Sequence, residues 1–82
     1  MNSILSEHAR KRCLRRKIDP AWIAQALAQP VRIERDAEDP ELAHALWPVP
    51  IMGLRVPRGI YRETVDPVVV ITACFDSSMN LP

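Results

Sequence analysis

The residues best suited to chemistry are one histidine and two arginines near the start of the chain. His8, Arg12 and Arg16 follow one another at intervals of four, which places them in one stripe if residues 6–17 form a helix. An imidazole can accept or donate a proton near neutral pH, and a guanidinium can hold a phosphate through two parallel hydrogen bonds. Together they suit a phosphodiester substrate. A solvated helix face, paired with acidic residues elsewhere, explains the same spacing.

Two further candidates lie in the second half of the chain. Thr72 is the polar member of the apolar run 68–75, and its hydroxyl is suited to orienting a phosphate or a ribose hydroxyl. Threonine also packs well in sheets without any such role. Arg58 is expected on a neighbouring strand, where a cation either contacts the substrate or guards a sheet edge against aggregation.

Charge is distributed unevenly, although the formal net charge is only +1. Residues 1–18 are strongly basic, residues 33–41 are acidic, and residues 55–62 are basic again. A basic patch attracts a polyanion whatever the total charge of the protein. RNA is therefore a candidate partner, and the side chains expected to contact it are Arg15, Arg16 and Arg62.

The length and the cysteine count exclude several classes of protein. Eighty-two residues form one domain, residues 1–82, which is too small for a doubly wound nucleotide-binding fold or an α/β barrel. Cys13 and Cys74 are too few for a disulfide framework, and no metal-ligand spacing is present. We expect two reduced, buried thiols, no metal and no cofactor.

The chain also lacks the sequence features of export and membrane insertion. No apolar segment approaches a signal peptide or the roughly 20 residues of a membrane-spanning helix, so we expect a cytoplasmic protein without membrane contact. A domain this short buries a small core, and a dimer or a protein partner would supplement its stability.

Two helices are expected at the N-terminal end of the chain. Residues 6–17 place Leu5, Ala9 and Cys13 in one apolar stripe, adjacent to the stripe of His8. The second helix begins at Asp19-Pro20, a typical cap followed by a typical first residue. It ends before Pro30.

Strands are expected to fill the rest of the chain. The patterns predict strands at residues 31–36, 54–65 and 68–75, the last two joined at Asp66-Pro67 and the last buried on both faces. Residues 37–53 are expected to form a long loop with a short helical turn, which leaves His44 solvated. The fold class is α+β: two N-terminal helices packed on one face of a small antiparallel sheet of three to four strands.

Both ends of the chain resemble a family of small bacterial and phage proteins whose domain has no assigned function. Members begin with a Ser/Thr-x-His-Ala-x-x-Arg-x-x-x-Arg-x-Ile helix and end in a Val-x-Val-Val-Thr-Ala-Tyr-Phe-Asp strand. This chain has Cys74 in place of the tyrosine and Lys17 in place of a glycine before Ile18, and Pro57 and Gly59 interrupt the strand before the last. The matching residues are Ser6, His8, Ala9, Arg12, Arg16, Ile18, Val69, Val70, Ile71, Thr72, Ala73, Phe75 and Asp76.

That family is grouped with the RelE/ParE-like and colicin-type ribonuclease toxins, and the resemblance implies their two-helix, four-stranded plan. It also implies metal-independent RNA cleavage, in which the ribose 2′-hydroxyl attacks the adjacent phosphate, and an antitoxin as protein partner. The residues that match the expected catalytic positions are His8, Arg12, Arg58 and Thr72. A non-catalytic module of the same fold, which binds a protein or a nucleic acid, is the alternative.

Overall fold

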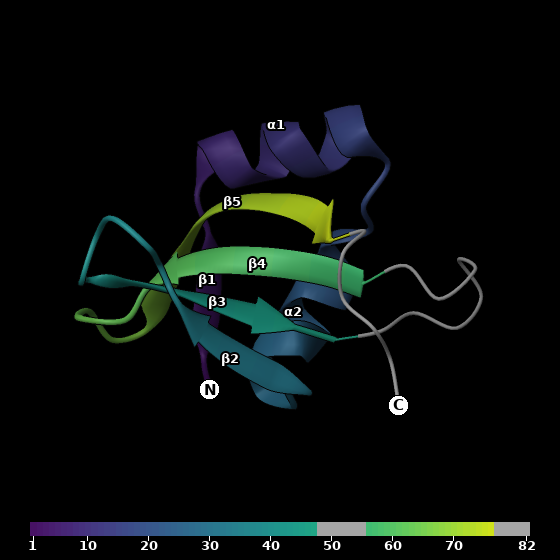
Figure 1. Cartoon of the computed structure of the whole chain (residues 1–82). Helices are drawn as coiled ribbons and strands as arrows, with labels where there is room; N and C mark the ends of the chain where they lie inside the picture. The colour runs from purple at the N-terminus through teal and green to yellow at the C-terminus, as the bar shows by residue number, and fades with distance from the viewer. Residues whose placement is uncertain (48–55, 77–82) are drawn as a thin grey trace.

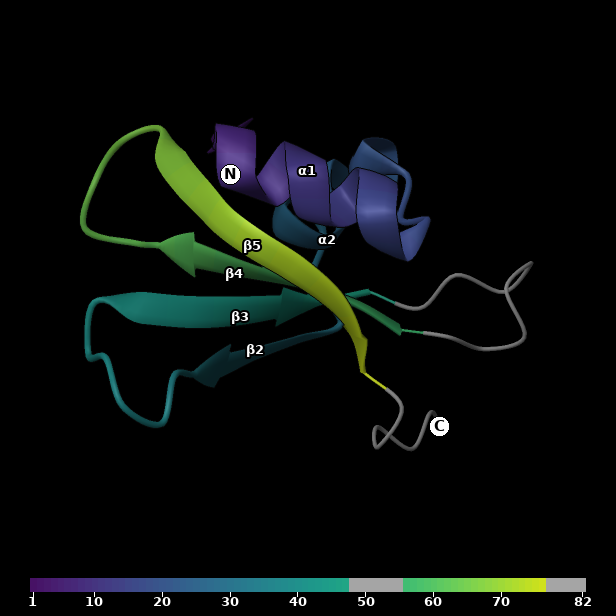
Figure 2. The same ribbon diagram turned by 90° about the horizontal axis from the view of Figure 1, so that it is seen from above.

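Two helices and a five-stranded sheet make up the described part of the chain, residues 1–47 and 56–76 of a computed structural model. Both helices lie on the same side of the sheet (Figures 1 and 2). The α+β class and the N-terminal position of the helices are therefore confirmed. In chain order the elements are β1 (Ser3–Leu5), α1 (Glu7–Arg16), α2 (Pro20–Ala28), β2 (Arg32–Arg35), β3 (Leu42–Leu46), β4 (Val56–Arg62) and β5 (Val68–Asp76).

Local capping signals determine where the two helices begin and end. The Ser6 side chain accepts a hydrogen bond from the Ala9 amide at 3.0 Å and starts α1. Asp19 caps α2 by accepting from the Ala21 amide at 2.9 Å. Lys17 ends α1 in the left-handed conformation, with φ 56°, at the position where the resembling motif has glycine. The predicted helices at residues 6–17 and 19–29 are thus confirmed.

The sheet has five strands in the order β1-β5-β4-β3-β2, and it is mixed. The expectation of a purely antiparallel sheet of three to four strands was wrong, because β1 pairs in parallel with the start of β5. Its register joins Ser3 to Val68 and Leu5 to Val70. A strand of three residues is too short to show an alternating pattern, so it could not be predicted from the sequence.

Strand β3 lies where a loop with a helical turn was expected, and that expectation was also wrong. Leu42–Leu46 pairs with β2 on one side and with β4 on the other. Ala43 and Ala45 are buried in the core beneath the helices, so pairing and burial override the helix propensity of alanine. Residues 48–53 of the expected loop lie outside the described residues.

Strand β4 contains both residues that were expected to interrupt it. Pro57 and Gly59 lie inside Val56–Arg62, which pairs with β3 and β5. Gly59 faces α2 so closely that a Cβ there would lie 3.0 Å from Cγ2 of Ile23. The first two residues of the strand expected at 54–65 lie outside the described part.

Strand β5 forms the predicted antiparallel pair with β4, and it lies inside the sheet between β1 and β4. It is buried on one face only, where Val68, Val70 and Ala73 pack beneath the helices. Thr72 and Cys74, on the other face, are half-buried. Burial on both faces was expected and is wrong, because both helices lie on one side.

Candidate functional site

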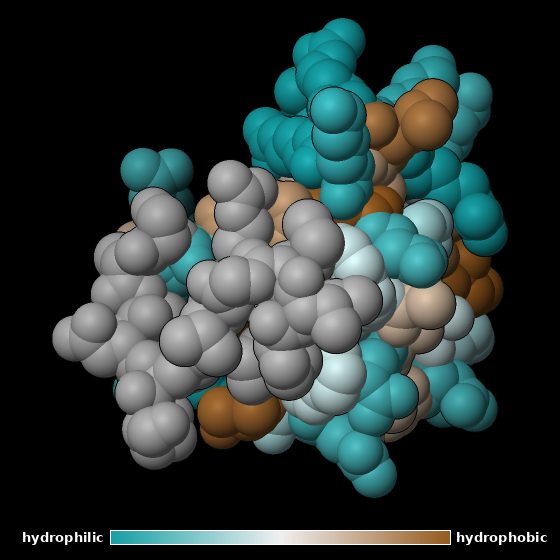
Figure 3. Space-filling view, turned by 90° about the vertical axis from the view of Figure 1, so that its right-hand side faces the viewer, coloured by the Kyte–Doolittle hydropathy of each residue, from teal (hydrophilic) through white to brown (hydrophobic). Residues whose placement is uncertain are grey.

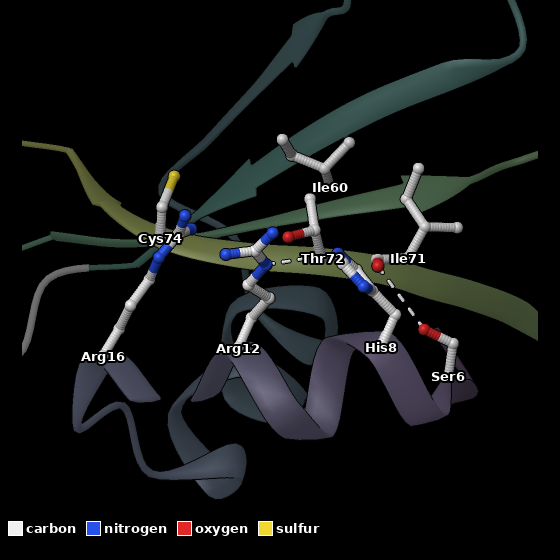
Figure 4. Close-up of a pocket in the computed structure, with 8 residues that line it drawn as sticks. All are labelled: Ser6, His8, Arg12, Arg16, Ile60, Ile71, Thr72 and Cys74. Carbon is white, nitrogen blue, oxygen red and sulfur yellow. Dashed lines mark hydrogen bonds between the residues drawn. The ribbon is translucent and has the colours of Figure 1, made fainter. Parts of the chain in front are cut away.

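A cleft of about 600 Å³ lies between α1 and the last two strands. It forms where β1 ends: β1 pairs only with residues 68–70 of β5, so the rest of that strand is free to meet α1. Figure 4 shows the helix side chains extending toward β5. The residues that line the cleft are Ser6, His8, Arg12, Arg16, Ile60, Ile71, Thr72 and Cys74.

The helix wall of the cleft is the stripe predicted from the sequence. Ala9 and Cys13 are buried and fix α1 on the sheet. Because His8, Arg12 and Arg16 flank that buried seam, they project into the cleft along its length (Figure 4). Hydrophilic side chains also dominate the surface over α1 in the face drawn in Figure 3.

Two hydrogen bonds tie the helix to carbonyl groups of β5 beyond the end of β1. Arg16 Nη1 donates to the carbonyl of Ala73 at 2.6 Å, and Ser6 Oγ donates to that of Ile71 at 3.4 Å. These carbonyls have no partner from β1, which pairs only up to Val70. A hydrogen bond between the α1 side of the cleft and β5 therefore lies at each end of the cleft.

His8 and Arg12 contact each other inside the cleft. Arg12 Nε donates to His8 Nε2 at 3.3 Å, which leaves the ring hydrogen of a neutral imidazole on Nδ1. His8 is exposed and Arg12 is half-buried, so both can be reached from solvent. None of the eight lining residues is acidic, and the site therefore favours an anion.

Thr72 and Cys74 form the floor of the cleft. The register between β4 and β5 shifts at Ile60 and Tyr61, which leaves Ile71 as an extra residue of β5. Thr72 and Cys74 then share the face opposite the buried one, and both line the cleft where the helix side chains reach past the edge of β5 (Figure 4). The structure thus brings together three of the four residues predicted for catalysis: His8, Arg12 and Thr72.

Arg58, the fourth predicted residue, does not line the cleft. Its guanidinium contacts Glu34 at 2.9 Å, His44 Nδ1 at 2.6 Å and the carboxylate of Asp76. Burial alone would lower the pKa of Arg58, but these carboxylates raise it. Its charge is compensated, so Arg58 is not a free cation beside the cleft.

The other predicted RNA-binding residues are divided in the same way. Arg16 lines the cleft. Arg62 pairs with Glu41 at 2.6 Å, and Arg15 is exposed on the last turn of α1 without lining the cleft.

Sequence analysis missed a cluster of polar side chains around Arg58 of β4, formed by Glu34 on β2, Asp36 directly after β2, His44 on β3 and Asp76 on β5. His44 was expected in solvent, but its side chain is only 15% exposed, and Nε2 lies 2.7 Å from Asp36 Oδ1. Backbone donation from Asp39, then the His44 ring and the Glu38 amide, lowers the pKa of Asp36 to about 2. The alternation Leu42-Ala-His-Ala-Leu was the signal for a strand here.

The cysteines differ in burial. Cys13 is 1% exposed, and desolvation raises the pKa of its thiol. Cys74 is only half-buried and lines the cleft, which corrects the expectation that both thiols are buried.

Comparison with known proteins identifies the family. A family model described as "Domain of unknown function (DUF4258)" matches residues 5–75. The chain belongs to this family. The match runs from the end of β1 into β5 and includes every described residue that lines the cleft. No curated protein and no solved structure matches the chain.

Membership of the DUF4258 family confirms the resemblance to a domain without an assigned function, while the grouping with ribonuclease toxins stays a prediction. Among residues 1–47 and 56–76, no group of three or more His, Cys, Asp or Glu side chains is arranged to hold a metal ion. No helix in that part has the length and apolar character needed to cross a membrane.

Proposed function

We propose that this DUF4258 domain is a metal-independent endoribonuclease of the toxin type, which cleaves RNA through attack of a 2′-hydroxyl. The supporting observation is the convergence of His8, Arg12, Arg16 and Thr72 on one cleft without an acidic lining residue. An imidazole can take the proton of the attacking hydroxyl, and two guanidinium groups can stabilise the negative charge that develops on the scissile phosphate.

Each side chain has a defined role in the proposal. Nε2 of His8 accepts the proton of the 2′-hydroxyl while the 2′-oxygen forms its bond to phosphorus and the bond to the 5′-oxygen breaks. The leaving 5′-oxygen takes a proton from water, and His8 afterwards returns its proton to water. Arg12 moves from His8 to the phosphate, which frees Nε2 and places the guanidinium on the developing negative charge. Thr72 orients the scissile unit from the floor of the cleft.

The contacts of Arg58 change one assignment. The resemblance implied a catalytic position for Arg58, but Glu34 and Asp76 already hold its guanidinium. Arg16 lines the cleft with Arg12, so we propose Arg16 as the second cation on the phosphate.

A pair of conservative substitutions on the same helix tests this site. Arg12→Lys keeps the charge but loses the two-point grip on phosphate, and we expect slower cleavage of a mixed RNA pool in EDTA. Arg10→Lys is the matched control: Arg10 lies on another face of α1 and does not line the cleft, so cleavage should stay near that of the wild type. Equal loss in both variants would place the chemistry elsewhere.

A non-catalytic binding module is the second candidate, and one observation favours it. The eight lining residues include a single imidazole, whereas the reaction moves one proton from the 2′-oxygen and another to the 5′-oxygen. A binding module would retain RNA without cutting it, and affinity would fall by about 0.7 log units per log unit of salt for each single-strand phosphate contacted. An antitoxin, another protein partner and a dimer stay predictions.

A further inference from the structure

Strand β2 leaves one edge of the sheet open. The strand order places β2 at one side of the sheet (Figure 1), and within residues 1–47 and 56–76 only β3 pairs with it. Two large apolar side chains lie at this edge, since Val31 is 49% exposed and Ile33 is 52% exposed. A row of free N–H and C=O groups is a template for a further strand, so this edge is suited to binding a strand of another chain.

The hydrogen bonds between β2 and β3 show which backbone groups of β2 are free. The Asp36 amide donates to the Leu42 carbonyl at 3.2 Å. Bonded and non-bonded residues alternate along an antiparallel pair, so Glu34 also directs its N–H and C=O groups toward β3. The N–H and C=O groups of Ile33 and Arg35 therefore point to the outer edge. A second strand must form its hydrogen bonds with these two residues.

The charges of β2 select one register for pairing with a second copy of itself. An antiparallel copy with the two-fold axis at Ile33 places Arg32 of each chain opposite Glu34 of the other. An axis at Arg32 would set two arginines opposite each other, and an axis at Glu34 would set two glutamates opposite each other. An axis at Arg35 would set Glu34 opposite Asp36. Opposite charges on facing residues stabilise a strand pair and like charges destabilise it, so of these four registers the one centred on Ile33 is favoured.

The side chains in this register also fit the two faces of the sheet. Ile33 pairs with Ala45, which is buried beneath the helices, so Ile33 lies on the helix side and meets Ile33 of the second copy there. This contact removes two half-exposed apolar side chains from water. Arg32 and Glu34 share the other face, where they lie 3.4 Å apart within one chain. With the second copy, the four charged side chains form a square in which the sign alternates.

Charged side chains often protect an edge strand from pairing, but the charges of β2 are compensated within the chain. Arg35 pairs with Glu63, and Glu34 contacts both Arg32 and Arg58. The strand contains no proline, so each of its residues can donate a backbone hydrogen bond. A second copy therefore meets no uncompensated positive charge on this strand.

We propose that two copies of this chain pair antiparallel through β2, with the two-fold axis at Ile33, and join their sheets into one. Such an interface is isologous, because both copies use the same residues. The proposal goes beyond the ribonuclease function and does not depend on it, since β4 and β3 lie between the cleft strand β5 and the paired edge. Interfaces that bury less than about 1,200 Å² are typically weak. For a strand of four residues we therefore expect a dissociation constant on the order of 10⁻⁴ M.

Sedimentation velocity over a range of protein concentrations tests the pairing, with two matched substitutions. We expect the mean mass of the wild type to rise from that of one chain toward that of two as the concentration passes the dissociation constant. Ile33→Lys places two ammonium groups at the axis and should weaken association by at least about tenfold. Leu14→Lys is the control, because Leu14 is 84% exposed on α1, away from β2 (Figure 1), and association should stay unchanged.

An exchange of charges between two variants tests the register. Arg32→Glu and Glu34→Lys each set like charges opposite each other in a self-pair, so each variant alone should associate at least about tenfold more weakly than the wild type. An equimolar mixture restores opposite charges at both facing positions and should dimerise again. Circular dichroism shows whether both variants keep the wild-type spectrum. If Glu34→Lys does not fold, the comparison of Ile33→Lys with Leu14→Lys decides.

Three results would overturn the proposed pairing. The first is a wild type that stays monomeric up to about millimolar concentration. The second is an equal loss of association in Ile33→Lys and Leu14→Lys. The third is a mixture of the two folded charge variants that associates no better than either variant alone. None of these results bears on the cleft, so the proposed ribonuclease function would stand.

Discussion

The close approach of β4 to α2 at Gly59 gives a stability prediction that can be worked from distances. A Cβ on residue 59 would lie 3.0 Å from Cγ2 of Ile23 and 3.3 Å from Cδ1 of Leu27. Two carbons pack best at about 3.5–4.0 Å, so Gly59→Ala brings both contacts inside the optimum. Ile23 and Leu27 are 0% and 1% exposed, and neither can move into solvent.

Two opposing effects set the magnitude for Gly59→Ala. Overpacking of a core costs about 1–3 kcal/mol, whereas replacing glycine by alanine in a strand recovers about 0.5–1 kcal/mol of backbone entropy. We therefore expect the free energy of unfolding to fall by about 1 kcal/mol. For a domain of this size the corresponding fall in Tm is about 4–8 °C. Gly59→Val adds further atoms at the same place and should cost more.

Urea unfolding followed by circular dichroism measures this change, and a second substitution checks its cause. Ile23→Val removes the Cδ1 atom, which lies 4.0 Å from the added Cβ, and gives the side chain room to shift. In the Ile23→Val background, Gly59→Ala should cost at least about 0.5 kcal/mol less, as expected for coupled neighbours. If Gly59→Ala raises stability in the wild-type background, the helix is not packed against β4 as described.

Three further predictions follow from the described residues. Lys17→Gly should raise the free energy of unfolding by about 0.5–1 kcal/mol in urea, because φ is 56° and only glycine adopts this region without steric cost; Lys17→Ala should not. Asp36 has a folded pKa of about 2 against about 3.9 unfolded, so its stabilisation is complete above about pH 4 and is lost as the pH falls toward 2. Urea midpoints between pH 2 and 6 should therefore fall less steeply for Asp36→Asn. Thiol titration should show one slow thiol, Cys13, and a faster one that Cys74→Ser removes; two equally slow thiols would contradict the difference in burial.

The helices could be predicted because their signals are local. Ser6 and Asp19 cap their helices within three residues of themselves, and Pro30 stops the second helix by its own geometry. Strand β1 carries no comparable signal, and β3 carries only the pattern Leu42-Ala-His-Ala-Leu. Each exists because other strands pair with it: β5, at the other end of the described chain, for Ser3–Leu5, and β2 and β4 for Leu42–Leu46.

The part of the candidate site that lies on helix α1 could also be predicted, but the contacts of Arg58 could not. Helical periodicity alone places His8, Arg12 and Arg16 in one row, and the structure keeps them together. The contacts of Arg58 depend on β3, because His44 faces it only when Leu42–Leu46 is a strand. With that segment expected as a loop, no pattern in the sequence could show that Arg58 is held by other side chains.

Cleavage of one RNA by the wild type and by His8→Ala, in EDTA, tests the central claim most directly. The measurement is the ratio of the two rates, together with the chemical form of the new 3′ end. The proposal predicts a loss of about 10²–10⁴-fold in His8→Ala and a 2′,3′-cyclic phosphate on the wild-type product. An unchanged rate in a folded His8→Ala protein, or no cleavage by freshly purified wild type, would contradict it.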